Sequence, residues 1–129
     1  MNRAVVAIGS NVDPERHVAA ALARLAAGLT VRARSALVRT RPVGPPDRPE
    51  YLNGAVLVET AMGRAALKAY LRGVEADLGR TRTADRYAPR TIDLDIVVWN
   101  GEVVDDDVRV RPYLRAAVRE VWPDLPLAP

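Results

Sequence analysis

The sequence predicts an α+β fold of the ferredoxin-like type, with elements in the order βαββαβ and an added β-hairpin. Two segments with helical periodicity alternate with runs of β-branched residues, and the pair Asn100-Gly101 interrupts the last of these runs. An Asn-Gly pair favours the two-residue turn of a hairpin. We therefore expect an antiparallel sheet packed by helices.

The first half of the chain supplies a strand, a helix and a second strand. The run "RAVVAIGS" (3–10) predicts a buried strand. A helix follows, with Asp13 as its N-cap, Pro14 in its first turn and Gly28 directly after its end. Residues 31–40 alternate apolar or small residues with arginines, which is typical of a half-buried strand.

The second half begins with "RPVGPPDRPE" (41–50), whose prolines predict a surface loop. A strand is expected over 51–60. The segment 63–80 predicts a helix, with Gly79 as its C-terminal stop. The final segment, 111–129, predicts a short helix and a tail bounded by prolines. The second helix presents one apolar face, formed by Leu67, Tyr70, Leu71, Val74 and Leu78.

Composition limits the possible classes of protein. A chain of 129 residues with 49% hydrophobic residues is expected to form one domain, 1–129. The absence of cysteine excludes disulfides and thiolate metal sites. No apolar run is long enough for a signal peptide, so we expect a cytoplasmic protein that does not enter membranes. The net charge of +3 comes from basic residues that are nearly all arginine, which suits an anionic ligand.

The run "TIDLDIVVW" contains two acids at strand spacing. Asp93 and Asp95 lie on one face, while Ile92, Leu94 and Ile96 lie on the other and face the core. Two neighbouring carboxylates repel each other, so a cation between them is favoured, and hard oxygen ligands indicate Mg²⁺. Taken alone, the pair favours an ordinary solvated strand face, which needs no metal.

Arginines accumulate just before this strand, at positions 80, 82, 86 and 90. An acid pair beside such a segment has the composition of a phosphoryl-transfer site that binds Mg²⁺ and a polyphosphate. The chain has no Walker-type loop, so side chains must hold the phosphates. A solvated basic loop or a nucleic-acid patch is the alternative.

Three motifs together resemble one family. The run "RYAPRTIDLDIV" (86–97) is similar to the signature of the 6-hydroxymethyl-7,8-dihydropterin pyrophosphokinases, and "AIGSN" and "RTRPVGPPDRPEYLNGAV" agree in the same order. The resemblance covers residues 3–104. It implies a ferredoxin-like enzyme of the folate pathway that transfers pyrophosphate from ATP to the pterin and releases AMP. It also implies a monomer whose partners are ATP and the pterin, without nucleic acid.

The resemblance also implies roles for individual residues. Asp93 and Asp95 are expected to hold two Mg²⁺ ions, and Arg80 and Arg90 to stabilise the transferring group. The nucleotide site is expected to comprise Glu75, Arg82, Arg86, Tyr87 and Ile96. The pterin site is expected to comprise Thr40, Val43, Tyr51 and Asn53.

The chain departs from the family mainly at its C-terminus. Tyr113 occupies the position expected for a phosphate-binding His, and Ala117 that of a Phe that covers the pterin. Tyr113 or Trp122 could provide the cover instead, and Arg72 stands where the family often has an amide. Two alternatives follow: a degenerate homologue that binds ATP or a pterin with little turnover or uses another acceptor, and an RNA-binding module. Base stacking by the latter requires strand aromatics, and only 5% of residues are aromatic.

Overall fold

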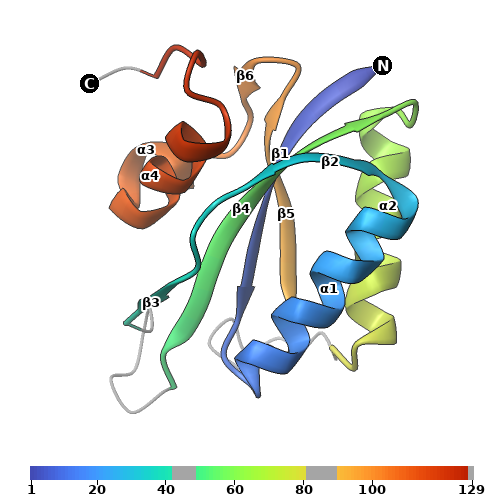
Figure 1. Cartoon of the computed structure of the whole chain (residues 1–129), viewed down its shortest axis with the longest axis vertical. Coiled ribbons are helices and arrows are strands. Elements are labelled where there is room, and N and C mark those ends of the chain that lie inside the picture. The colour runs from blue at the N-terminus through green and yellow to red at the C-terminus, as the bar shows by residue number, and fades with distance from the viewer. Residues whose placement is uncertain (42–48, 81–89, 128–129) are drawn as a thin grey trace.

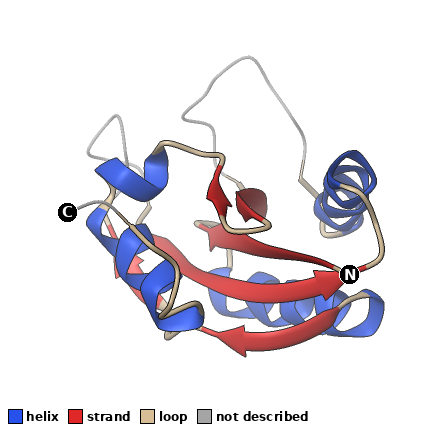
Figure 2. Ribbon diagram, turned by 90° about the horizontal axis from the view of Figure 1, so that it is seen from above, coloured by secondary structure: helices blue, strands red, loops and turns tan. Residues whose placement is uncertain are grey.

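The computed structural model describes residues 1–41, 49–80 and 90–127, and these form an α+β arrangement with helices on both sides of an antiparallel sheet (Figures 1 and 2). The strands of the described part are β1 Asn2–Ser10, β2 Thr30–Arg34, β3 Val38–Thr40, β4 Tyr51–Thr60, β5 Asp93–Trp99 and β6 Glu102–Val103. The helices are α1 Pro14–Gly28, α2 Arg64–Asp77, α3 Asp107–Val110 and α4 Pro112–Val121. No helix among the described residues has the length and apolar character needed to cross a membrane.

Strand β1 lies in the middle of the sheet. The strand order is β2-β4-β1-β5-β6, with β3 also paired to β4, and β1 is antiparallel to both of its neighbours. In this register, Gly9 faces Asn53 of β4 on one side and Asp93 of β5 on the other. Residues from three distant segments of the chain therefore meet in one row.

Helices α1 and α2 cover one face of the sheet (Figure 1). The face is covered because every second residue of the central strands is apolar and matches an apolar stripe on each helix. The fully buried side chains of this layer include Val6, Leu25, Leu67, Leu71, Ile92 and Leu94.

Helices α3 and α4 pack on the opposite face (Figure 1). Helix α4 lies mainly on β4 and also contacts β1 and β2. The apolar side chains of this layer include Val5, Leu57, Val97, Val98, Leu114, Val118 and Val121. Strand β5 has a bulge at Val97: Val98 pairs with Val5 of β1 and Ile96 pairs with Val6, so Val97 has no partner on β1. As a result, the successive residues Val97 and Val98 both belong to the core under these helices. The other end of this face, around Gly9, is left open by the helices and forms a cavity.

Residues 31–40 are not one continuous strand, contrary to the prediction. The hydroxyl of Ser35 accepts the amide hydrogen of Ala55, which occupies a donor that strand pairing needs. The amide of Ala36 donates to Glu120 of α4 instead of to a strand. The amide of Ser35 still donates to the carbonyl of Ala55 at 2.9 Å, but the amides of Ala55 and Ala36 bond to side chains instead of to backbone carbonyls, and β2 and β3 form separately.

The predicted helix ends and the predicted turn are mostly confirmed. Asn100 and Gly101 have φ of 49° and 90°, as a type I′ turn requires, and Gly79 has φ of 89° after α2. Asp13 is the N-cap residue of α1, as predicted, although its carboxylate binds Arg16 rather than a helix amide. One detail was wrong: Gly28 is the last residue of α1 instead of following it.

Candidate active site

A cavity of about 270 Å³ opens on the sheet face that α4 leaves uncovered. Its walls come from β1, β4 and β5 and from the start of the C-terminal helices. The polar residues that line it include Asn11, Thr40, Asn53, Asp93, Asp95 and Tyr113. Residues of both predicted half-sites, for the pterin and for the metal, thus share one cavity.

Small residues form the floor of this cavity. Gly9 lies between Asn53 and Asp93 across the sheet, and Ala7 lies between Ala55 and Asp95 one row further on. A Cβ atom at Gly9 would lie 2.8 Å from Oδ1 of Asn53, so only glycine leaves the amide in place. The floor therefore has room for a ligand because its central strand carries almost no side chain.

The acid pair faces the cavity as the strand alternation predicted. Ile92 and Leu94 are fully buried on the α1/α2 side, while the side chains of Asp93 and Asp95 are 23% and 42% exposed. Burial in the cavity wall, together with the negative charge of Asp93, raises the pKa of Asp95 from 3.8 to about 6. The two carboxylates are close enough to disfavour double ionisation, as expected of a site that takes up a cation.

Within the described part of the chain, three arginines bond to the two acids. Both oxygens of Asp93 accept guanidinium hydrogen bonds, Oδ1 from Arg80 at 2.8 Å and Oδ2 from Arg90 at 2.9 Å. Oδ1 of Asp95 accepts one from Arg72 at 3.2 Å. Of the two predicted catalytic arginines, Arg90 lines the cavity, whereas Arg80 lies behind Asp93 with only 8% of its side chain exposed.

Glu75 is a buried acid rather than an exposed one. Its side chain is 2% exposed and lies between α2 and β5. Its carboxylate accepts hydrogen bonds from Arg72 at 2.7 Å, from Arg80 at 2.8 Å and from the amide of Leu94 at 2.8 Å. Glu75 is not among the residues that line the cavity, and within the described chain it reaches the site through the arginines that hold Asp93 and Asp95.

The predicted pterin residues that the structure describes lie together at the other end of the cavity. The Asn53 amide donates to the Thr40 hydroxyl, and Tyr51 lies in the same wall. Ile96 belongs to the opposite face, where it packs against the α1/α2 core. Four predicted site residues, Val43, Arg82, Arg86 and Tyr87, lie outside the described residues.

The C-terminal residues divide between the cavity and the core. Tyr113 lines the cavity, and burial raises the pKa of its hydroxyl above the usual value. Ala117 is a buried residue of α4 that faces the core, and Trp122 packs against the same core with the guanidinium of Arg3 5.4 Å from its ring centre. Of the proposed replacements for an aromatic cover, only Tyr113 is therefore at the site.

Sequence reasoning missed several cavity residues. Asn11 is 5% exposed, and its side chain accepts the amide of Arg90 at 2.7 Å, which ties the end of β1 to the start of the acidic strand segment. Its membership of the quoted "AIGSN" motif was the available signal. Asp107 and Arg111, paired at 3.3 Å, line the far wall, where α3 and α4 bring them; no local pattern indicated this.

The donor set fits Mg²⁺ bound jointly with a phosphate ligand. Among the described residues, no group of three or more His, Cys, Asp or Glu side chains is arranged to hold a metal. Two carboxylates on one cavity wall are available, and Mg²⁺ in nucleotide sites commonly takes one or two protein carboxylates and completes its shell with phosphate oxygens and water. The site therefore suits a metal that arrives with a nucleotide.

An acid pair, surrounding arginines and an adjoining cavity define the class of the protein as an enzyme of phosphoryl-group transfer. Residues 5–123 match the family described as 7,8-dihydro-6-hydroxymethylpterin-pyrophosphokinase (HPPK). The chain belongs to this HPPK family, so its activity is pyrophosphoryl transfer from ATP to hydroxymethyldihydropterin in folate synthesis.

Known relatives cover most of the chain. It is 38% identical to the 2-amino-4-hydroxy-6-hydroxymethyldihydropteridine pyrophosphokinase of Methylorubrum extorquens over 97% of this chain and 85% of the relative. The Bacillus subtilis enzyme of the same name is also 38% identical, over 88% of this chain and 70% of the relative. A mitochondrial folate synthesis bifunctional protein of Pisum sativum is 36% identical over 86% of this chain and 22% of its own length.

Proposed function

We propose that the cavity above Gly9 is where this chain transfers pyrophosphate, with the pterin at the Asn53 end and Mg²⁺-ATP at the Asp93–Asp95 end. The observation that carries the proposal is the row Asn53–Gly9–Asp93. In this row the amide of Asn53 can hydrogen-bond the edge of a pterin, and the carboxylate of Asp93 can bind a cation. Only Gly9 lies between them, and all three residues line one cavity. Substrates at the two ends would have their reacting groups next to each other.

Each side chain has a definite role in this proposal. Bound Mg²⁺ would neutralise phosphate charge and orient the reacting oxygens. Asp93 and Asp95 would hold two such ions, and Arg90 on the cavity wall would bind a transferring phosphate, with Arg80 supporting Asp93 from behind. The pterin hydroxyl oxygen forms a bond to the β-phosphorus, the bond from that phosphorus to the α-phosphate oxygen breaks, AMP leaves, and the hydroxyl proton passes to water.

Tyr113 is proposed as the aromatic cover of the pterin. It is half-buried in the cavity wall on the side that α4 provides, while Tyr51 lies on the β4 side. A flat ring between two aromatic side chains gains stacking as well as burial. In this arrangement the altered C-terminal segment keeps a cover for the pterin but draws it from a different position along the chain.

The remaining proposals concern the whole chain. Without β3 and β6, the elements follow βαββαβ with the sheet order β2-β4-β1-β5, and this supports a ferredoxin-like fold. We also propose a single domain over 1–129 that works as a monomer in the cytoplasm.

Mg²⁺-dependent nucleotide binding tests the site. Calorimetry with a non-hydrolysable ATP analogue should show tight binding only with Mg²⁺ and a loss of at least about tenfold in Asp95→Asn, because a ligand is removed while the fold is retained. Glu102→Gln, an exposed acid on β6, is the matched control and should bind like the unaltered protein. Unchanged Mg²⁺-dependent binding in folded Asp95→Asn would show that the metal site lies elsewhere.

A further inference from the structure

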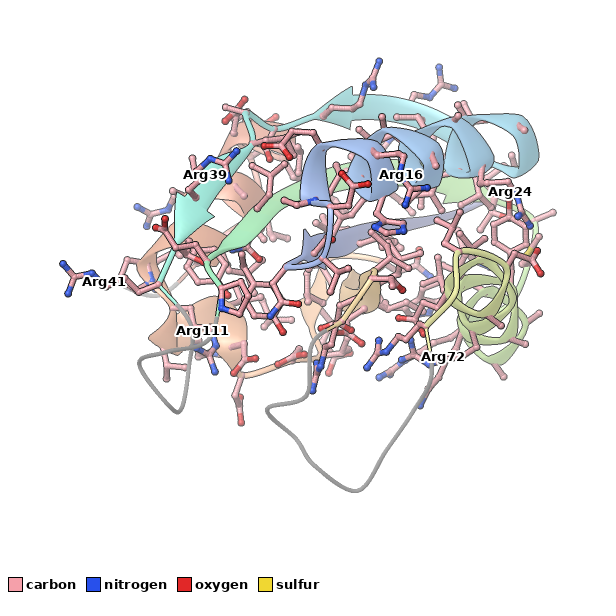
Figure 3. The ribbon with its side chains drawn as sticks, turned by 90° about the horizontal axis from the view of Figure 1, so that it is seen from below. Arg16, Arg24, Arg39, Arg41, Arg72 and Arg111 are labelled. Carbon is pink, nitrogen blue, oxygen red and sulfur yellow. The ribbon has the colours of Figure 1, made fainter. Side chains whose placement is uncertain are left out.

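Arg72 connects three parts of the site without lining the cavity (Figure 3). One terminal nitrogen, Nη1, donates to Glu75 at 2.7 Å and to the backbone carbonyl of Leu94 at 2.9 Å. The other, Nη2, donates to Oδ1 of Asp95 at 3.2 Å. The guanidinium is therefore fixed on one side to the protein interior and bound on the other to an acid of the cavity.

The fixed side is rigid because its anchor is buried. Glu75 is 2% exposed and is itself held by the amide of Leu94 and by Arg80. The backbone carbonyl of Leu94 belongs to β5, the same strand as Asp95. The planar fork of Arg72 is thus set by α2 and β5 before any ligand binds, and losing it would leave Glu75 with one cation fewer in the interior.

We propose that Arg72 is a positioning residue for the metal site: it holds one oxygen of Asp95 so that the other is directed to Mg²⁺. This inference rests on the proposed role of Asp95 as a metal ligand. Among the described residues, no hydrogen bond to Oδ2 of Asp95 is made, whereas both oxygens of Asp93 are engaged. Asp95 therefore presents one oxygen that no described residue contacts by a hydrogen bond, whereas Asp93 would bind a cation through oxygens that Arg80 and Arg90 also contact.

Two opposing effects of Arg72 can be separated. As a cation it repels Mg²⁺, so its removal would tighten metal binding if charge dominated. As a hydrogen-bond donor to a ligand it fixes the carboxylate, and removing such a partner usually weakens metal affinity about 10- to 100-fold. The fixed geometry favours the second effect, because Glu75 already offsets the arginine charge at 2.7 Å.

The test compares Arg72→Ala and Arg72→Gln with Arg64→Ala, which removes an exposed arginine from the first turn of the same helix. Calorimetry measures Mg²⁺-dependent binding of the ATP analogue, and kinetics measure the Mg²⁺ concentration for half-maximal rate and the KM for pterin. Arg72→Ala should weaken the Mg²⁺-dependent binding of the ATP analogue, and raise the Mg²⁺ concentration for half-maximal rate, by about tenfold or more. The KM for pterin should stay unchanged. Arg72→Gln should recover part of the loss, because an amide can still donate to Asp95.

The outcomes are distinct. An unchanged or lowered Mg²⁺ requirement in folded Arg72→Ala, beside a clear loss in Asp95→Asn, would overturn the role of Arg72 and leave the metal site standing. If Asp95→Asn itself binds Mg²⁺-nucleotide normally, the proposed metal site fails first. A loss of pterin and nucleotide affinity together in Arg72→Ala, without a change in Mg²⁺ dependence, would assign Arg72 a structural role only.

Discussion

At the scale of the residue, Gly9 is expected to control whether the cavity can hold the pterin that we place there. The Cβ of a Gly9→Ala variant would lie 2.8 Å from Oδ1 of Asn53, in the row that joins the two half-sites. Either the amide turns away from the ligand or the strands separate slightly. We expect the KM for pterin to rise about tenfold or more, with a smaller effect on ATP binding, since overpacking costs about 1–3 kcal/mol.

A second glycine serves as the control for this prediction. A Cβ at Gly73 meets nothing within 4 Å, on the exposed side of α2. Gly73→Ala should leave both KM values unchanged and raise the free energy of unfolding by about 0.5–1 kcal/mol, measured by urea denaturation. Equal pterin KM values in Gly9→Ala and Gly73→Ala would remove Asn53 from the pterin site.

The raised pKa of Asp95 leads us to expect that the stability of the protein depends on pH when no metal is present. Burial, and then the charge of Asp93, raise the pKa of Asp95 from 3.8 to about 6 in the folded protein. The folded state therefore binds a proton more tightly than the unfolded state between these pH values. This contribution to stability is present below about pH 4 and is lost as the pH rises through 6.

Urea denaturation without Mg²⁺ checks the sign of this effect. The stability of the unaltered protein relative to Asp95→Asn should fall between pH 4 and 6 and be constant above about pH 7, where Asp95 is ionised in both states. Above pH 6, Mg²⁺ with nucleotide should restore the loss in the unaltered protein and not in the variant. A stability difference that does not change with pH would show that Asp95 titrates normally.

At the scale of the element, helix α4 closes the cavity on one side while it buries its own apolar face. Leu114 and Val118 point into the core, and Tyr113 lies at the edge where the helix meets the cavity. Tyr113→Ala should raise the KM for pterin about tenfold, because it removes a stacking partner worth about 0.5–1.5 kcal/mol together with its buried area.

Tyr113→Phe separates stacking from the hydroxyl. It keeps the ring and should keep the pterin KM within about twofold of the unaltered value, since the ring supplies the proposed contact. If both variants bind pterin normally, the cover is provided by other residues. If both lose affinity equally, the hydroxyl and not the ring makes the contact.

Elements with a strong local signal were predictable from the sequence, and those set by tertiary contacts were not. Asn100-Gly101 and Gly79 supply the positive φ that their turns need, so the hairpin and the end of α2 follow from the residues alone. The break at Ser35 involves a hydrogen bond from the amide of Ala36 to Glu120, which lies far away in the sequence. No local sequence pattern indicates this contact. The strand alternation placed Asp93 and Asp95 correctly, whereas the burial of Glu75 required the packing of α2 on β5.

At the scale of the whole molecule, the two faces of the sheet have different tasks. Helices α1 and α2 fully cover one face and form the larger core. The opposite face is shared between the α3/α4 core and the cavity. Both acids of the cavity lie on β5. The reverse side of this strand is fixed by buried Leu94 and by Ile92 directly before it, next to buried Val6 of β1. This arrangement places the ligand groups on rigid elements rather than on loops.

Charge balance also belongs to this scale. Among the described residues, Asp93, Asp95 and Glu75 are paired with Arg72, Arg80 and Arg90. Mg²⁺ brings positive charge and ATP brings negative charge, so the loaded site can also stay close to neutral. The metal and the nucleotide should therefore bind far better together than either does alone, which the calorimetric series with and without Mg²⁺ measures.

The decisive measurement is whether this protein forms AMP from ATP in the presence of the pterin. The purified protein is incubated with ATP, Mg²⁺ and 6-hydroxymethyl-7,8-dihydropterin, and the nucleotide and pterin products are quantified by chromatography and mass spectrometry. We expect AMP and diphosphorylated pterin in equal amounts, formed only when both pterin and Mg²⁺ are present. Folded protein that binds ATP but forms no pterin-dependent AMP would contradict this expectation and indicate a degenerate homologue that has kept the fold without the turnover.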